Sequence, residues 1–183
     1  MGLTTEQVHW IGGALIAATV FLMLLKQSGV LPWQRLDYLL PLLLVGYGIE
    51  SAADVWLHGD AVPSNYGSEA RQHLLQGGVM LAAGLIQGLV LGGTLQHRLW
   101  QLAVPLSLAF TGVVFWLHVH QGMEHSMALV MTQHRSFAVS LLVAAGAKAV
   151  AVLGGQRARA FEVAWLLPLL LFGIELMIYT EQM

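Results

Sequence analysis

The sequence predicts an all-α integral membrane protein with six transmembrane helices, and three observations lead to this prediction. The 183-residue chain is 57% hydrophobic and only 10% charged, with a mean hydropathy of +0.69, whereas a soluble domain of this size needs more polar residues on its surface. Apolar stretches recur along the whole length. Each is long enough to cross about 30 Å of hydrocarbon. We therefore expect residues 1–183 to form a single six-helix transmembrane domain.

The six predicted helices are separated by short polar connections. The connection over 59–70 is the longest and most polar, and Ser126 is a candidate N-cap for the fifth helix. We expect the first stretch to be a retained helix and not a signal peptide, because Glu6 precedes it and Lys26 follows it. The predicted helices cover residues 7–26, 37–58, 72–94, 99–120, 127–153 and 161–181.

The basic residues predict the orientation of the helices. Six of them lie at the first, third and fifth connections, and only Arg71 and Arg135 lie at the opposite side. The positive-inside rule then places both termini on the outer, periplasmic side of a bacterial inner membrane. The net charge of −2 gives no electrostatic basis for binding nucleic acid. The six inner basic residues are Lys26, Arg35, Arg98, Lys148, Arg157 and Arg159.

An internal repeat is visible in the even helices. The letters LLPLLL occur at 39–44 and again at 166–171, and 103–108 is a weaker copy. The prolines Pro41, Pro105 and Pro168 are therefore 64 and 63 residues apart. This spacing predicts three tandem helical hairpins, each of which begins at the outer face.

Histidines gather at the predicted outer face, where seven of the eight lie, and only His97 lies at the inner one. A polar group buried in hydrocarbon is costly unless it is paired or serves a site, so we expect a polar pocket there. Its core members would be Asp54, His58, His73, His118 and His134. Its second-rank members would be His9, His120, Glu124, His125 and Glu181.

These residue types indicate a metal site. Asp54 and His58 are four residues apart, as are His120 and Glu124, so each pair shares a helix face. Methionines lie nearby and cysteine is absent, and thioether with imidazole favours copper as Cu(I), although Zn or Fe would suit the carboxylates. The sequence thus predicts a membrane-embedded metal-binding protein for metal acquisition, delivery or redox use. The methionine series is Met123, Met127 and Met131.

Two alternatives stay open. Two histidines on facing helices could ligate a b-type haem for electron transfer. The chain could also be an accessory transmembrane subunit of a larger membrane complex, with its histidines at the headgroup boundary. Expected partners are the lipid bilayer and either other membrane subunits or a periplasmic metal carrier. The sequence identifies no enzymatic reaction, because it contains no phosphate loop, nucleophile elbow or dinucleotide fingerprint.

Overall fold

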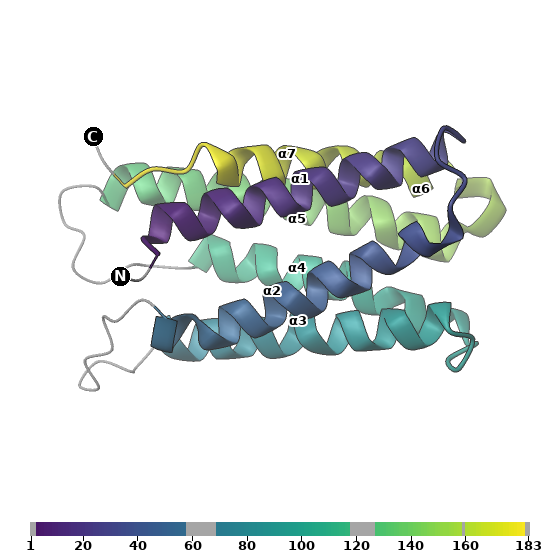
Figure 1. Ribbon diagram of the computed structural model, residues 1–183, viewed down its shortest axis with the longest axis horizontal. Helices are drawn as coiled ribbons and strands as arrows, with labels where there is room; N and C mark the ends of the chain where they lie inside the picture. The colour runs from purple at the N-terminus through teal and green to yellow at the C-terminus, as the bar shows by residue number, and fades with distance from the viewer. Residues whose placement is uncertain (1–2, 58–68, 118–126, 159, 182–183) are drawn as a thin grey trace.

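The protein is a bundle of long helices that run along one common direction (Figure 1). A computed structural model describes residues 3–57, 69–117, 127–158 and 160–181, and these residues contain no β-strand. Within them, five segments are long and apolar enough to cross a membrane: Thr5–Gln27, Gln34–Ala53, Arg71–Leu91, Arg98–Leu117 and Met127–Gly154. The helices are α1 (Thr5–Gln27), α2 (Leu39–Leu57), α3 (Glu69–Leu91), α4 (Ala103–Leu117), α5 (Met127–Gly154), α6 (Phe161–Ala164) and α7 (Leu166–Met177).

The three repeated prolines occupy the same place in their helices. Pro41, Pro105 and Pro168 are each the third residue of α2, α4 and α7. Proline is tolerated in a first turn because the N–H that it lacks would have no partner within the helix. A 3₁₀ segment leads into two of these helices, Gln34–Tyr38 before α2 and Arg98–Leu102 before α4. The sequence repeat is thus a repeat of local structure as well.

The sixth predicted helix is broken and shorter than expected. It divides at Trp165 into α6 and the 12-residue α7. Pro168 explains the break, because it has no N–H to donate to the carbonyl of Ala164, four residues earlier. The prediction that the helix continues to residue 181 was wrong: it ends at Met177, and the N–H groups of Thr180 and Glu181 donate to side chains of α5 and α1.

Three helix pairs make the most extensive contacts in the bundle. They join α2 to α3, α4 to α5, and the first helix α1 to the last helix α7. The closest pairs therefore join α2 and α4 each to the helix that follows it, and they join the first helix α1 to the last helix α7. They are not the two helices of each predicted tandem hairpin.

Small residues allow these pairs to approach closely. A Cβ atom added to Gly13 would lie 2.5 Å from the carbonyl oxygen of Gly173, and one added to Gly77 would lie 2.6 Å from that of Gly48. One added to Gly112 would lie 3.1 Å from the carbonyl oxygen of Ala138. Gly13, Gly77 and Ala138 each follow a histidine by four residues. Each pair is therefore packed backbone to backbone one helical turn from a histidine.

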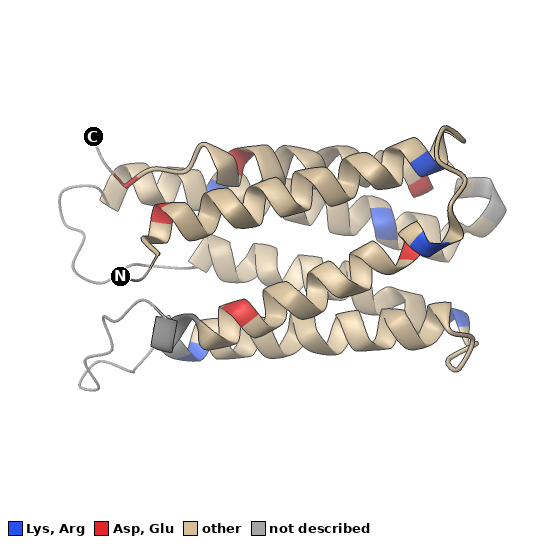
Figure 2. Cartoon of the chain, in the orientation of Figure 1, with Lys and Arg blue, Asp and Glu red and all other residues tan. Residues whose placement is uncertain are grey.

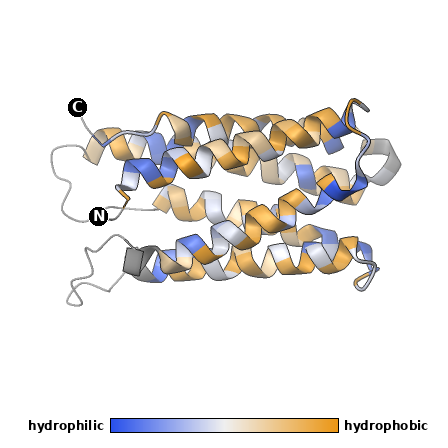
Figure 3. Ribbon diagram, in the orientation of Figure 1, coloured by the Kyte–Doolittle hydropathy of each residue, from blue (hydrophilic) through white to orange (hydrophobic). Residues whose placement is uncertain are grey.

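The surface of the bundle suits a lipid environment. Large apolar side chains such as Leu42, Leu106 and Ile178 are exposed, while Val20, Leu141 and Leu166 fill the interior. Figure 3 shows hydrophobic residues along the length of the helices and hydrophilic ones mainly toward the ends. Charged residues also gather toward the two ends (Figure 2). This distribution agrees with the predicted membrane insertion.

Candidate functional site

Helices α1 and α5 bring two histidines together near the end of the bundle where both helices begin. The ring centroids of His9 and His134 lie 6.4 Å apart, with an angle of 74° between the ring planes. His134 is 2% exposed and His9 is half-buried. Tyr179, which follows α7 and is completely buried, stacks on His9 at 4.1 Å between centroids with 20° between planes. We call His9, His134 and Tyr179 the histidine–tyrosine cluster.

Each histidine in the cluster is held in the same way by its own helix. The Nδ1 atom of His9 lies 2.8 Å from the carbonyl oxygen of Thr5, and that of His134 lies 2.8 Å from the carbonyl oxygen of Val130. A carbonyl oxygen can only accept a hydrogen bond, so Nδ1 carries the proton in both rings. In the neutral ring Nε2 then carries the lone pair, which is the arrangement that suits a metal ligand or a hydrogen-bond acceptor.

Aromatic rings surround His134. Phe115 and Phe137 both lie 5.5 Å from it between centroids, and Tyr179 meets it edge-on at 5.8 Å. Phe172 extends the group, at 6.0 Å from Phe115 and 5.8 Å from Phe137. On these sides the imidazole therefore faces apolar rings, which solvate charge poorly.

A set of polar contacts fixes the segment that carries Tyr179. Trp10 donates from Nε1 to the Tyr179 carbonyl oxygen at 2.8 Å. The Gln133 side chain donates to the Thr180 carbonyl oxygen at 2.8 Å and accepts from the Thr180 N–H at 3.1 Å. Glu6 accepts at Oε1 from the Thr180 hydroxyl and from the Glu181 N–H, both at 2.9 Å. The Tyr179 hydroxyl donates to Glu181 Oε1 at 3.0 Å. Side chains from α1 and α5 thus hold this irregular segment.

The structure brings together only part of the predicted pocket. His9 and His134 lie side by side, and Glu181 joins them through Tyr179. His73 lies near the start of α3, where its backbone carbonyl oxygen accepts a hydrogen bond from the Ser51 hydroxyl of α2 at 3.2 Å. Asp54 lies in α2, but its side chain is outside the described residues. Also outside them are His58, His118, His120, Glu124 and His125.

The complete ten-residue pocket therefore stays a prediction. Among the residues that the structure describes, no group of three or more His, Cys, Asp or Glu side chains is arranged to hold a metal ion. Of the predicted members whose side chains are described, His9 and His134 lie together and Glu181 is bonded to Tyr179 beside them. His73 lies apart from them, in the α2–α3 pair.

Three residues that position the cluster were not predicted from the sequence. Glu6 was considered only as a charge that precedes the first helix, and Tyr179 and Gln133 were given no role in the site. A signal for two of them was present. Glu6 precedes His9 by three residues, and Gln133 directly precedes His134, so both lie in the same helical turn as a candidate ligand.

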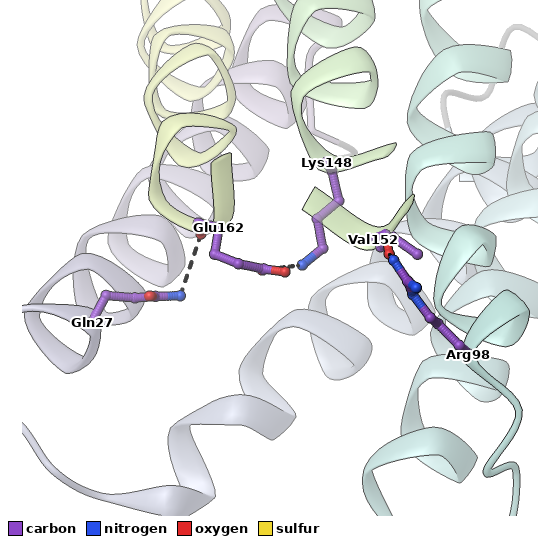
Figure 4. A network of polar contacts seen from close by, with 5 residues as sticks. All are labelled: Gln27, Arg98, Lys148, Val152 and Glu162. Atoms are coloured by element: carbon purple, nitrogen blue, oxygen red, sulfur yellow. Dashed lines mark hydrogen bonds and ion pairs between the residues drawn. The ribbon is translucent and has the colours of Figure 1, made fainter. Parts of the chain in front are cut away.

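A second polar network lies at the opposite end of the bundle (Figure 4). Lys148 forms an ion pair with Glu162 at 2.7 Å, and its ammonium lies 5.1 Å from the centroid of the Trp165 ring. Gln27 donates to the Glu162 carbonyl oxygen at 3.4 Å, and Arg98 donates from Nε to the Val152 carbonyl oxygen at 2.6 Å. No partner of Lys148 was predicted from the sequence. In the structure this network connects α1, α5 and α6.

A further carboxylate lies within α7. Glu175 accepts a hydrogen bond at Oε1 from the Ser136 hydroxyl of α5. Its Oε2 atom is buried and has no hydrogen-bond partner among the described residues. This contact ties α5 to α7 on the same half of the bundle as the histidine–tyrosine cluster.

Comparison of the chain with protein-family models, curated proteins and solved structures found no match. The geometry and chemistry of the described residues are therefore the basis for assigning a function.

Proposed function

We propose that this protein is a membrane-embedded metal-binding protein, with copper the favoured metal, that serves metal acquisition, delivery or redox use. The observation that carries the proposal is the His9–His134 pair, in which both Nδ1 atoms are bonded to backbone carbonyls. Metal-ligating histidines commonly donate their second ring nitrogen to a carbonyl or carboxylate, which orients the ring and raises its basicity.

The position of the pair supports this proposal over a purely interfacial role. A histidine at the headgroup boundary is satisfied by water, whereas His134 is 2% exposed. Its Nδ1 atom is bonded to the Val130 carbonyl oxygen, so the ring is held inside the bundle by its own helix.

The packing around the pair favours a bare ion over haem b. A porphyrin between two axial histidines needs an open slab perpendicular to the axis that joins them. Here Tyr179 stacks on His9 and also meets the edge of His134, and Phe115 lies against the other ring. A haem would have to displace these buried side chains.

The outer, periplasmic side is the proposed location of the cluster. Basic residues such as Lys26, Arg35 and Arg98 lie at the opposite end of the bundle, and such residues mark the cytoplasmic side. A reporter fused at Asn65 should therefore be active in the periplasm, and the same reporter fused at Arg98 should be active in the cytoplasm. A cytoplasmic signal at Asn65 would reverse the proposed orientation.

Metal analysis of the purified chain tests the function itself. The wild-type protein should carry copper, and His134→Ala and His9→Ala should each lose most of it. An ion bound only by the folded state adds stability by mass action, about 2.7 kcal/mol at a free concentration one hundred times Kd. The melting temperatures of wild type and variants should therefore converge after treatment with a chelator.

His97→Ala is the matched control for this experiment. His97 is an exposed histidine at the opposite end of the bundle, where its ring accepts from the Leu99 N–H at 3.3 Å. This variant should keep its metal. A wild-type protein that remains free of metal after exposure to copper would favour the accessory-subunit alternative, and a Soret band in its spectrum would favour haem.

A further inference from the structure

We infer that the outward face of α5 is a dimer interface, at which two copies of this chain pack α5 against α5 with the same orientation in the membrane. The inference rests on α5 and on its neighbours α4 and α7, and it does not depend on metal binding. Three observations lead to it: the spacing of the exposed residues along α5, an exposed glycine among them, and a basic and an acidic group on the two flanks of this face.

The exposed residues of α5 follow a heptad pattern. Steps of three and four residues alternate along this face for five successive steps. A helix with small or apolar residues at this spacing keeps one stripe facing a partner helix that winds around it with a left-handed twist. The opposite side of α5, which carries His134, Leu141 and Ala145, is buried inside the bundle. The residues of the exposed stripe, here called the α5 seam, are Ser136, Val139, Val143, Gly146, Val150 and Leu153.

Gly146 makes the seam suited to a second helix as well as to lipid. Inside a bilayer there is no hydrophobic driving force between helices, so close packing at small residues and hydrogen bonds stabilise their contact. A Cβ added to Gly146 would meet no atom within 4 Å, whereas those added to Gly13 and Gly77 would collide with the backbone of a neighbouring helix. Gly146 therefore allows a close approach that none of the described helices uses.

The two flanks of the seam carry opposite charges. Arg135 lies on the flank toward α4, where its guanidinium carbon is 6.0 Å from the centroid of the exposed Trp116 ring. Glu175 lies on the flank toward α7, where its Oε1 accepts from the hydroxyl of the seam residue Ser136. Its Oε2 is buried and has no hydrogen-bond partner in the described part of the chain. Ionisable groups within membranes usually pair with one another, and Arg135 of a second copy is the partner that we assign to Glu175.

Two-fold symmetry would bring these charges together. Both copies insert with the same topology, so the symmetry axis is parallel to the membrane normal and equivalent residues keep the same depth. Arg135 directly precedes Ser136, and Glu175 is bonded to Ser136, so the two charges lie at nearly the same depth. In a parallel pair of helices, each flank of one seam faces the opposite flank of the other. The flank with Arg135 therefore faces the flank with Glu175 of the second copy, and this contact occurs twice.

The first test is the oligomeric state of the labelled full-length chain, measured by single-molecule photobleaching in liposomes over a series of protein-to-lipid ratios. The wild type should form dimers. Gly146→Leu should weaken dimerisation by about tenfold, because the new side chain keeps the two backbones apart. Gly78→Leu is the matched control: Gly78 is an exposed glycine of α3 whose added Cβ also meets no atom within 4 Å. It should dimerise like the wild type, and both variants should keep their fold.

The charge pair is tested with Arg135→Gln, Glu175→Gln and the double variant. Each single substitution should weaken dimerisation by about tenfold, as expected for a polar contact between membrane helices. The double variant should be no weaker than either single variant, because all three lose the same contact. Losses that simply add would overturn the assignment of this pair.

Cysteine substitutions locate the interface, and the chain has no cysteine of its own. Identical seam residues of a parallel pair face each other, and a disulfide needs Cα atoms within about 7 Å. Val143→Cys and Val150→Cys should therefore form disulfide-linked dimers on mild oxidation with diamide. Leu142→Cys, which is exposed but lies beside the seam, should form far fewer.

The outcomes also separate this inference from the proposed function. A chain that stays monomeric at every ratio overturns the inference and leaves this face to a different membrane subunit. A dimer that persists in Gly146→Leu and does not cross-link at Val143 uses another surface, which also overturns it. His134 lies on the opposite side of α5, so Gly146→Leu should keep its copper. A wild-type chain that dimerises through α5 but binds no metal would support this inference and contradict the proposed function.

Discussion

Gly13→Ala is expected to lower the free energy of unfolding by about 2 kcal/mol, as is typical of overpacked interfaces, and to weaken metal binding at the same time. The added Cβ would lie 2.5 Å from the Gly173 carbonyl oxygen and 2.8 Å from the Met177 backbone nitrogen. Backbone atoms cannot rotate away, so α1 and α7 must separate. His9 lies one turn from Gly13 on the same face of α1, and it would move relative to Tyr179 and His134. Thermal unfolding and Cu(I) titration measure the two effects.

Gly77→Ala and Gly78→Ala are the controls. A Cβ on Gly77 would lie 2.6 Å from the Gly48 carbonyl oxygen in the α2–α3 pair, whereas one on Gly78 meets no atom within 4 Å. Gly77→Ala should therefore destabilise the protein by a similar amount while its folded fraction still binds metal. Gly78→Ala should change neither property for the worse. Normal metal binding by Gly13→Ala would show that the α1–α7 contact does not position the site.

Gln133→Ala is the second substitution with a large expected effect. It removes two hydrogen bonds to the Thr180 backbone, at 2.8 and 3.1 Å. Each such bond contributes about 1 kcal/mol, and the Thr180 N–H and carbonyl would be left without this partner in a partly buried place. We expect a loss of about 2 kcal/mol of stability and faster amide exchange over residues 178–181, since local opening follows the loss of local contacts.

Thr132→Ala is the control for Gln133→Ala. Thr132 is exposed and donates to the Ala128 carbonyl oxygen of its own helix, so its removal should leave exchange at residues 178–181 unchanged. Exchange that stays slow in Gln133→Ala would mean that Glu6 and Trp10 hold the segment without it.

The bundle could be predicted from the sequence because the bilayer sets the length of its helices. Apolar stretches of about 20 residues cross the membrane wherever they occur in the chain, and α1, α3 and α5 lie close to their predicted ranges. The end of the last helix was not predictable in this way. Beyond Tyr179 the N–H groups of Thr180 and Glu181 donate to Gln133 and Glu6, which are far from this segment in sequence.

The position of His9 and His134 along the membrane normal could be predicted from the sequence, but the direction in which their side chains point could not. His9 and His134 were expected at the same level because both lie near the outer starts of odd helices. Whether they face one another depends on the rotation of α1 and α5, which packing determines. The contact of Gly13 with Gly173 and the anchoring of Tyr179 by Trp10 set that rotation. No pattern within either helix encodes a contact between residues 169 positions apart.

The packing of α1 against α7 determines when the site can form during synthesis. α1 leaves the ribosome before α7, but the surfaces that cover Gly13 and His9 come from residues 173–181. Chains grow at about 5–20 residues per second, so the first helix waits in the membrane for many seconds before its partner arrives. A nascent or truncated chain can hold helices α2 to α5, yet it lacks Tyr179 and cannot close around His9. The histidine–tyrosine cluster can therefore assemble only after residues 173–181 have been synthesised and have packed against α1.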